Sequence, residues 1–131
     1  MDDFIWPIRV YYEDSDAGGV VYHTNYLKFM ERARTEWLRN KGFNHIALKQ
    51  QHNFIFVLRK ISVDYLKPAF FDDLLTISVH ISKIGKASII MAQQVQRDAE
   101  VLCTAEVKLA GINAVTLRPQ AFPLDVFNVL N

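Results

Sequence analysis

The segment from Tyr11 to Tyr26, YYEDSDAGGVVYHTNY, brings together a carboxylate, two glycines and a histidine just before a helical pattern begins. Asp16 can take a proton from water or attack a carbonyl carbon. Gly18 and Gly19 allow a tight turn and a close approach of the backbone to a ligand. The helix start that follows offers free backbone N–H groups, including that of His23, which favour a developing oxyanion. Acids followed by glycines are also common in solvated turns, so these residues alone leave a catalytic and a structural role open.

Three other residues of this segment have alternative roles. Tyr12 precedes Asp16 by four residues and either hydrogen-bonds in the same site or serves as a strand aromatic. His23 either has a satisfied ring at the helix start or positions water or the carboxylate. Glu13 and Asp14 add two more carboxylates next to Asp16. We expect Asp14 to cap or form a turn rather than to react.

A long helix is expected to follow this segment and to position it. From Asn25 the sequence NYLKFMERARTEWLRNKG predicts a helix of about 17 residues, about 26 Å long. Thr24 or Asn25 can cap its start, and Gly42 suits the left-handed position after its end. The apolar arc that would face a core comprises Tyr26, Phe29, Met30, Ala33 and Trp37.

The remaining periodicity predicts an antiparallel sheet. Apolar residues alternate with polar ones at the period of a half-buried strand, and turn residues such as Gly85 separate the runs. A short helical segment, NHIALKQQ, precedes most of them. We expect strands at residues 5–13, 60–65, 75–82, from 87 to the RDAE segment, and 101–109, the last four forming a meander.

These lengths predict the fold class. Strands of about ten residues span about 33 Å, so one curved antiparallel sheet can wrap the single long helix. This α+β arrangement is the hotdog fold. Its free edge strand is expected to pair with a second copy of the chain.

Composition narrows the function classes. The 131 residues have the length of one domain, 1–131, and the net charge of +1 provides no global field for nucleic acid or anionic lipid. The N-terminus predicts no signal peptide and no membrane span, hence a cytoplasmic location. The single cysteine, Cys103, is expected in the core, and no Cys/His cluster has zinc spacing, so we expect no metal. The histidines without partner spacing, expected on the surface or in the core, are His45, His52 and His80.

The run RVYYEDSDAGGVVYHTNY, followed by MERARTEWL, resembles the acyl-CoA thioesterases related to 4-hydroxybenzoyl-CoA thioesterase, in the group associated with the Tol-Pal cluster. The resemblance is concentrated in residues 9–40 and continues as topology to about Leu117. Ser15 stands where the family more often has Thr or Cys, and the tail LRPQAFP has fewer basic residues than its relatives. The resemblance implies hydrolysis of acyl-CoA to a free acid and CoA, without a cofactor. Asp16 would be the general base or nucleophile, and backbone N–H groups at the helix start would form the oxyanion hole.

The resemblance also implies where the substrate lies. Acyl-CoA is expected between the subunits of a homodimer or homotetramer, and acyl carrier protein is a candidate further partner. The phosphates of CoA call for cations at the mouth of the site. The candidate substrate-binding residues are Gly18, Gly19, Val20, Arg59, Lys60 and Lys86, with Arg118 as a further candidate. A related thioesterase class places its acid on the helix, but here Glu31 and Glu36 have Lys28 and Arg32 in pairing range and are expected on the surface.

Two other functions are compatible with the same fold. A non-catalytic protein that binds acyl-CoA or acyl carrier protein needs no carboxylate beside the carbonyl, so Asp16 favours the enzyme. A hydratase or dehydratase needs a histidine and an acid placed for proton abstraction from the acyl chain, and His23 alone does not separate it. The sequence determines neither the preferred acyl chain nor the choice between direct attack and water activation by Asp16.

Overall fold

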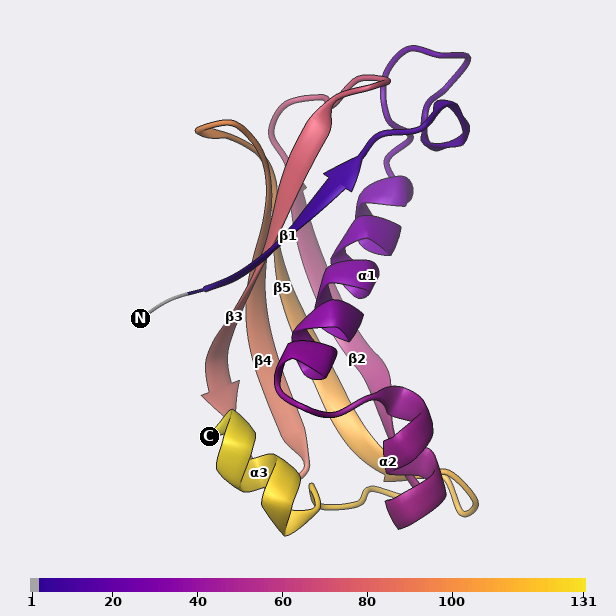
Figure 1. Ribbon diagram of the computed structural model, residues 1–131, viewed down its shortest axis with the longest axis vertical. Coiled ribbons are helices and arrows are strands. Elements are labelled where there is room, and N and C mark those ends of the chain that lie inside the picture. Colours follow the sequence, from indigo (N-terminus) through magenta and orange to yellow (C-terminus); the bar gives the residue numbers. More distant parts are fainter. Residues whose placement is uncertain (1–2) are drawn as a thin grey trace.

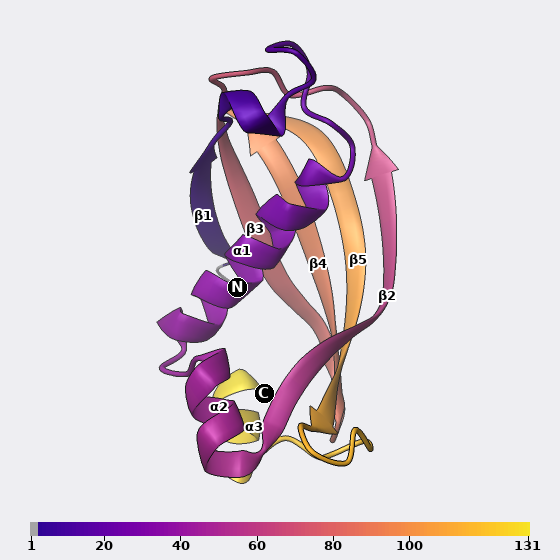
Figure 2. The same ribbon diagram turned by 90° about the vertical axis from the view of Figure 1, so that its right-hand side faces the viewer.

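The computed structural model describes residues 3–131, in which a curved antiparallel sheet carries a long helix along one face (Figure 1). In chain order, the elements are β1 (Phe4–Arg9), the short 3-10 helix η1 (Tyr12–Asp14), α1 (Asn25–Asn40), α2 (His45–His52), β2 (Phe54–Tyr65), β3 (Leu74–Ile84), β4 (Ser88–Arg97), β5 (Glu100–Asn113) and α3 (Leu124–Leu130). Figure 2 shows α1 lying along the sheet and α2 lying near the start of β2. The predicted α+β hotdog architecture is confirmed.

The strands are arranged in the order β1-β3-β4-β5-β2. β3, β4 and β5 form the expected antiparallel meander. β2 does not join it beside β3, because it pairs instead with β5, from Phe54 opposite Asn113 to Tyr65 opposite Cys103. β1 takes the place beside β3. The prediction of four strands in consecutive order was therefore wrong for β2, since periodicity identifies a strand but not its neighbour.

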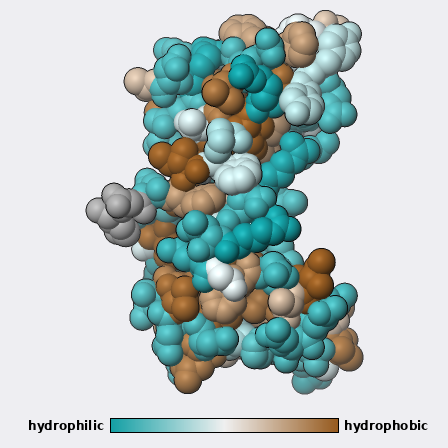
Figure 3. All heavy atoms as spheres, in the orientation of Figure 1, coloured by the Kyte–Doolittle hydropathy of each residue, from teal (hydrophilic) through white to brown (hydrophobic). Residues whose placement is uncertain are grey.

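The apolar arc of α1 packs against the facing side of the sheet. Its five predicted members are all buried: Tyr26, Phe29, Met30, Ala33 and Trp37. The sheet contributes the alternate residues of its central strands, such as Leu75, Ile77, Val79, Ile89 and Met91, which are also buried. Hydrophobic side chains outside this core appear as separate patches between hydrophilic ones (Figure 3). Burial of the arc, rather than helix propensity, is the main stabilisation of α1.

The two ends of α1 differ in how well the sequence anticipated them. Gly42 has φ +95, in the left-handed region expected after the helix. At the start, however, Thr24 makes no side-chain capping bond, and the Asn25 amide donates to Asp14 Oδ1 at 3.0 Å instead. The cap prediction was wrong because the neighbouring turn offers a buried carboxylate, which the Asn25 side chain satisfies.

Two element boundaries and one short helix also differ from the predictions. β1 ends at Arg9 rather than at residue 13, because η1 turns the chain there. β2 begins at Phe54 rather than near residue 60, since its first residues, FIFVL, are continuously apolar and show no alternation. The short helix α3 was not predicted, because its seven residues are too few for a clear helical period.

Gly111→Ala is expected to destabilise the fold more than an ordinary surface substitution. A methyl group at this position in β5 would lie 2.3 Å from Cε2 of Phe54, which is fully buried, and 2.7 Å from the Gln120 carbonyl oxygen. Neither neighbour can move freely, because Gln120 N–H donates to the Gly111 carbonyl at 2.9 Å. Overpacking of this kind costs about 1–3 kcal/mol. Chemical denaturation should show the loss, and Gly42→Ala, where nothing lies within 4 Å, tests the separate cost of a positive φ. Equal stability of Gly111→Ala and wild type would contradict the close packing.

Cys103 lies in the core, as predicted, with a fully buried side chain. Burial, assisted by the nearby negative charge of Asp64, raises the pKa of its thiol to about 11. Cys103 therefore remains protonated and inert at neutral pH. Within residues 3–131, no helix is both long and apolar enough to cross a membrane, and no three acidic, histidine or cysteine side chains form a metal-binding group.

Candidate active site

The connection between β1 and α1, which contains Asp16, lies at one end of the sheet next to the connection between β2 and β3 (Figure 1). The loop closes through two backbone hydrogen bonds, from Asp16 N–H to the Val20 carbonyl at 2.8 Å and from Gly19 N–H to the Asp16 carbonyl at 3.1 Å. Between them, Ala17 and Gly18 have φ values of 53 and 78. The Asp16 residue itself is exposed. A short loop closed by backbone hydrogen bonds thus exposes Asp16 to solvent.

The two glycines of the loop have different roles. Gly18 takes the left-handed conformation, whereas Gly19 does not. A methyl group on Gly18 would lie 3.1 Å from the ring of Tyr12, and one on Gly19 would lie 3.3 Å from the Asp16 carbonyl oxygen. The Tyr12 ring also packs edge-on against Phe71, with centroids 5.8 Å apart. Tyr12 therefore lies beside the Asp16 loop through ring contacts.

The Asp16 loop is docked on the segment between β2 and β3. Val21 N–H donates to the Ala69 carbonyl at 2.9 Å, and Phe71 N–H donates to the Gly19 carbonyl at 3.0 Å. Val20 and Phe70 face each other between these bonds as an antiparallel bridge. Val20, a predicted substrate-binding residue, is 43% exposed on this docked strand. The position of Asp16 thus depends on a segment about 50 residues further along the chain.

Asp14 connects the loop to the start of α1, as expected for a structural rather than a reacting acid. Its side chain is 5% exposed. Oδ2 accepts the Tyr11 N–H at 2.9 Å, and Oδ1 accepts the Asn25 side-chain amide at 3.0 Å. Its carbonyl also accepts the Tyr22 N–H at 3.1 Å. These three bonds set the spacing between the Asp16 loop and the helix start.

His23 lies two residues before the start of α1 at Asn25 and is exposed. Its ring packs against Tyr22, with centroids 4.5 Å apart, and its carbonyl accepts a hydrogen bond from the Tyr65 hydroxyl at 2.9 Å. No acceptor among residues 3–131 bonds its backbone N–H. A cavity of about 250 Å³ opens beside it, lined by Val21, His23, Tyr26, Tyr65, Leu66, Lys67 and Pro68. The helix start thus has an available N–H donor next to a cavity.

Tyr65 is a site residue that the sequence did not reveal. Its place in the alternation of β2 predicts a side chain facing the core, but it is 46% exposed and reaches the helix start. Tyr26 lines the same cavity beside Tyr65, and its hydroxyl accepts the Ala69 N–H at 2.9 Å. Burial raises the pKa of Tyr26, and that hydrogen bond opposes the shift. No local sequence signal indicates these contacts, because both partners are more than 40 residues away.

A second cavity, of about 360 Å³, lies further along α1, between that helix, α2 and β2. Its lining residues are Glu31, Arg34, Thr35, Trp37, Leu38, His45, Ile55, Phe56, Leu58 and Leu109. Arg34 Nη1 donates to Gln93 Oε1 at 2.9 Å, and Gln93, 1% exposed, donates to the Met30 carbonyl. Burial lowers the pKa of Arg34, an effect that nearby Glu31 opposes. No residue pattern in the sequence predicted this cavity.

The two helical carboxylates lie apart from Asp16. Glu36 forms a surface ion pair as expected, but with Arg39 at 3.0 Å rather than with Arg32. Glu31 faces the second cavity. Neither glutamate has a hydrogen bond to the Asp16 loop, which is linked through Asp14 to Tyr11, Tyr22 and Asn25.

The predicted phosphate-binding cations are spread over the sheet. Arg59 and Lys60 are exposed on β2, where the register with β5 shifts between Leu58 and Lys60. Lys86 lies in the turn after β3, and its carbonyl accepts the Phe122 N–H at 2.8 Å. Arg118 follows β5 at that same end of the sheet. These last two residues therefore lie at the opposite end of the roughly 33 Å long β3 from the segment that receives the Asp16 loop.

Comparison with known proteins agrees with this geometry. Residues 10–130 match the family model of the Thioesterase-like superfamily. An acyl-CoA thioesterase, YbgC, of Haemophilus influenzae is 43% identical over 94% of this chain and 90% of its own. The acyl-CoA thioester hydrolase YbgC of Escherichia coli O6:H1 is also 43% identical, over 94% of this chain and 92% of its own.

The fold comparison points to the same group. The crystal structure of a probable thioesterase from Bartonella henselae matches with a TM-score of 0.88 and 38% identity, covering 93% of this chain and all of the other. The resemblance inferred from residues 9–40 is thereby confirmed. By its fold and by its sequence match over most of its length, the chain belongs to the Thioesterase-like superfamily, in the group that contains the YbgC thioesterases.

Proposed function

We propose that this protein hydrolyses acyl-CoA thioesters to a free acid and CoA. The observation that supports the proposal is the link through Asp14, whose hydrogen bonds to Tyr11, Tyr22 and Asn25 join the segment that carries the exposed Asp16 to the start of α1. The backbone N–H of His23 lies in the same segment and has no acceptor among residues 3–131. Asp16 supplies a base or nucleophile, and the His23 N–H supplies an oxyanion donor. The acyl-CoA thioesterases of similar sequence support the substrate class.

The reaction breaks the C–S bond of the thioester. Asp16 either removes a proton from the attacking water or adds directly to the carbonyl carbon, and negative charge then develops on the carbonyl oxygen. The His23 N–H, at the positive end of the α1 dipole, stabilises that charge. When Asp16 acts as the base, collapse of the tetrahedral intermediate releases the free acid and a CoA thiolate, which takes the proton from Asp16. When Asp16 attacks directly, collapse releases the thiolate and leaves a mixed anhydride of Asp16 and the acyl group. Water then hydrolyses the anhydride to the free acid and the Asp16 carboxylate, and the thiolate takes up the proton that the water releases. Both groups belong to the chain, so the proposed mechanism uses no cofactor.

A dimer would complete the site. The sheet has two edges, and β1 is a poor one because it has six residues and Pro7 lacks an N–H. β2 has twelve residues, and we propose that it pairs with β2 of a second copy. A two-fold axis makes this pairing antiparallel, so the Phe54 end of one β2 lies beside the Tyr65 end of the other. The cavity at Phe56 and Leu58 then adjoins the partner's helix-start cavity and offers a second wall for the acyl group.

Initial rates of CoA release test the proposed activity. The substrates are acyl-CoAs ranging from short aliphatic through long-chain to aromatic, and a thiol reagent detects free CoA. Cys103 does not interfere in the native protein, because it is buried. We expect saturable hydrolysis of at least one class. Tight binding of acyl-CoA with no release of CoA would instead support the alternative of a non-catalytic binding protein.

A further inference from the structure

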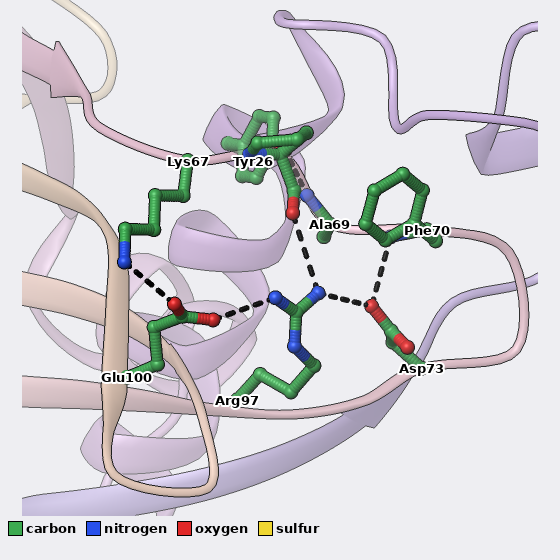
Figure 4. A network of polar contacts seen from close by, with 8 residues as sticks. Tyr26, Lys67, Ala69, Phe70, Asp73, Arg97 and Glu100 are labelled. Atoms are coloured by element: carbon green, nitrogen blue, oxygen red, sulfur yellow. Dashed lines mark hydrogen bonds and ion pairs between the residues drawn. The ribbon is translucent and has the colours of Figure 1, made fainter.

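Arg97 lies at the centre of a polar network at the same end of the sheet as Asp16. It is the last residue of β4, and its guanidinium forms a fork between two carboxylates (Figure 4). Nη1 donates to Asp73 Oδ2 at 2.8 Å, and Nη2 donates to Glu100 Oε1 at 2.6 Å. Lys67 bonds the other oxygen of Glu100 at 2.7 Å. Such forked pairs fix geometry better than a single point charge does.

Through these contacts Arg97 holds the segment between β2 and β3 at several points. Nη1 also donates to the Pro68 carbonyl at 3.3 Å. Asp73 Oδ2, which Arg97 contacts, accepts the Phe70 N–H at 2.9 Å, and the guanidinium carbon lies 5.6 Å from the centre of the Phe70 ring. Residues 68–73 are therefore held from both ends and over one face by a single side chain (Figure 4).

Residues 68–73 are also the segment on which the Asp16 loop is docked. Ala69 accepts the Val21 N–H, and Phe71 donates to the Gly19 carbonyl. Gly19 in turn donates to the Asp16 carbonyl. Hydrogen bonds thus tie Arg97 to residues 68–73, and other hydrogen bonds tie the backbone of the same segment to Val21 and Gly19 of the Asp16 loop.

We propose that Arg97 is a positioning residue for catalysis, which holds the Asp16 loop in place through residues 68–73. The proposal rests on the proposed function of Asp16. The side chains of Asp73 and Arg97 are 22% and 26% exposed, so the ion pair is partly buried and can hold the segment in one geometry. Among residues 3–131, no other cation lies within salt-bridge distance of Asp73, and its loss leaves the segment without that anchor.

Arg97→Met tests the proposal by retaining the aliphatic stem and removing the fork. We expect kcat to fall by about 10- to 100-fold, the scale of a misplacement of about 1 Å, while KM changes by less than about threefold. Arg97→Lys should give an intermediate kcat, because an ammonium can keep one pair but not the fork. The matched control is Arg39→Met, which removes the Arg39–Glu36 pair on the surface of α1 and should leave kcat unchanged.

Amide hydrogen exchange provides a readout independent of activity. In Arg97→Met the Val21 and Phe71 amides should exchange faster, while amides in the centre of the β4–β5 pairing should keep their wild-type rates. Unchanged exchange at both amides would overturn the proposal, as would a wild-type kcat or an equal fall in kcat in Arg39→Met.

A double variant tests the role of Arg97 in positioning separately from the role of Asp16 in catalysis. If Arg97 acts through Asp16, adding Arg97→Met to Asp16→Asn should lower kcat no further, whereas an independent second fall would contradict that route. A fully active Asp16→Asn enzyme would refute the function proposed for Asp16. The exchange rates of the Val21 and Phe71 amides in Arg97→Met would still decide whether Arg97 holds the loop.

Discussion

Asp16→Asn is expected to lower kcat for acyl-CoA hydrolysis by at least about 100-fold, the lower scale for the loss of a general base. The amide keeps the size of the carboxylate but can neither accept a proton from water nor attack the carbonyl carbon. The fold should persist, because the hydrogen bonds that hold the loop come from the Asp16 backbone and not from its side chain. Steady-state rates and thermal melts of the same preparations measure both effects.

Binding and a control substitution complete this test. A non-hydrolysable thioether analogue of the substrate should bind Asp16→Asn with nearly wild-type affinity, since little of the binding energy comes from the carboxylate. Asp98→Asn makes the same chemical change in an exposed turn with φ 54, which asparagine tolerates, and should retain full activity. A kcat for Asp16→Asn within a few-fold of wild type would reject the catalytic assignment.

If the chain pairs through β2 as proposed, Leu58→Glu is expected to give monomers and to abolish most of the activity. Leu58 is 50% exposed and lies in β2, at the sheet edge proposed for pairing. A carboxylate there would either repel the same carboxylate of the second subunit or be buried in the interface without water, and both effects disfavour the dimer. Light scattering of the wild type should give about two or four times the chain mass of 15.1 kDa. Leu124→Glu, at an equally apolar exposed position on α3, should leave the mass and kcat unchanged.

A mixture of two inactive variants tests whether each active site is formed by residues of both subunits. Thr35→Trp should fill the second cavity and inactivate the dimer while leaving Asp16 intact. In an equal mixture with Asp16→Asn subunits, half of the dimers would be mixed, each with one intact site, so about a quarter of wild-type activity should return. A fully active monomer, or no recovery in a mixture proven to exchange subunits, would place the whole site within one chain.

The order of residues along the chain determined much of this protein. The 3.6-residue period fixed which face of α1 is buried, and the alternation in β3 to β5 identified three neighbouring strands, because both patterns depend only on the local geometry of the backbone. The motif around Asp16 identified the family, and the role of Asp14 followed from its place at a turn. These features could be predicted because each depends on residues that lie close together in the sequence.

Only the tertiary structure decided which distant segments support that motif. Tyr65 reaches His23, residues 69–71 receive the Asp16 loop, and Arg97 clamps residues 68–73, although each contact joins parts of the chain that are more than 20 residues apart. The partner of β2 was likewise undetermined, since β3 and β5 present similar alternating faces. Such pairings depend on how the loops cross and on which contacts together exclude water, and a local pattern carries no information about either.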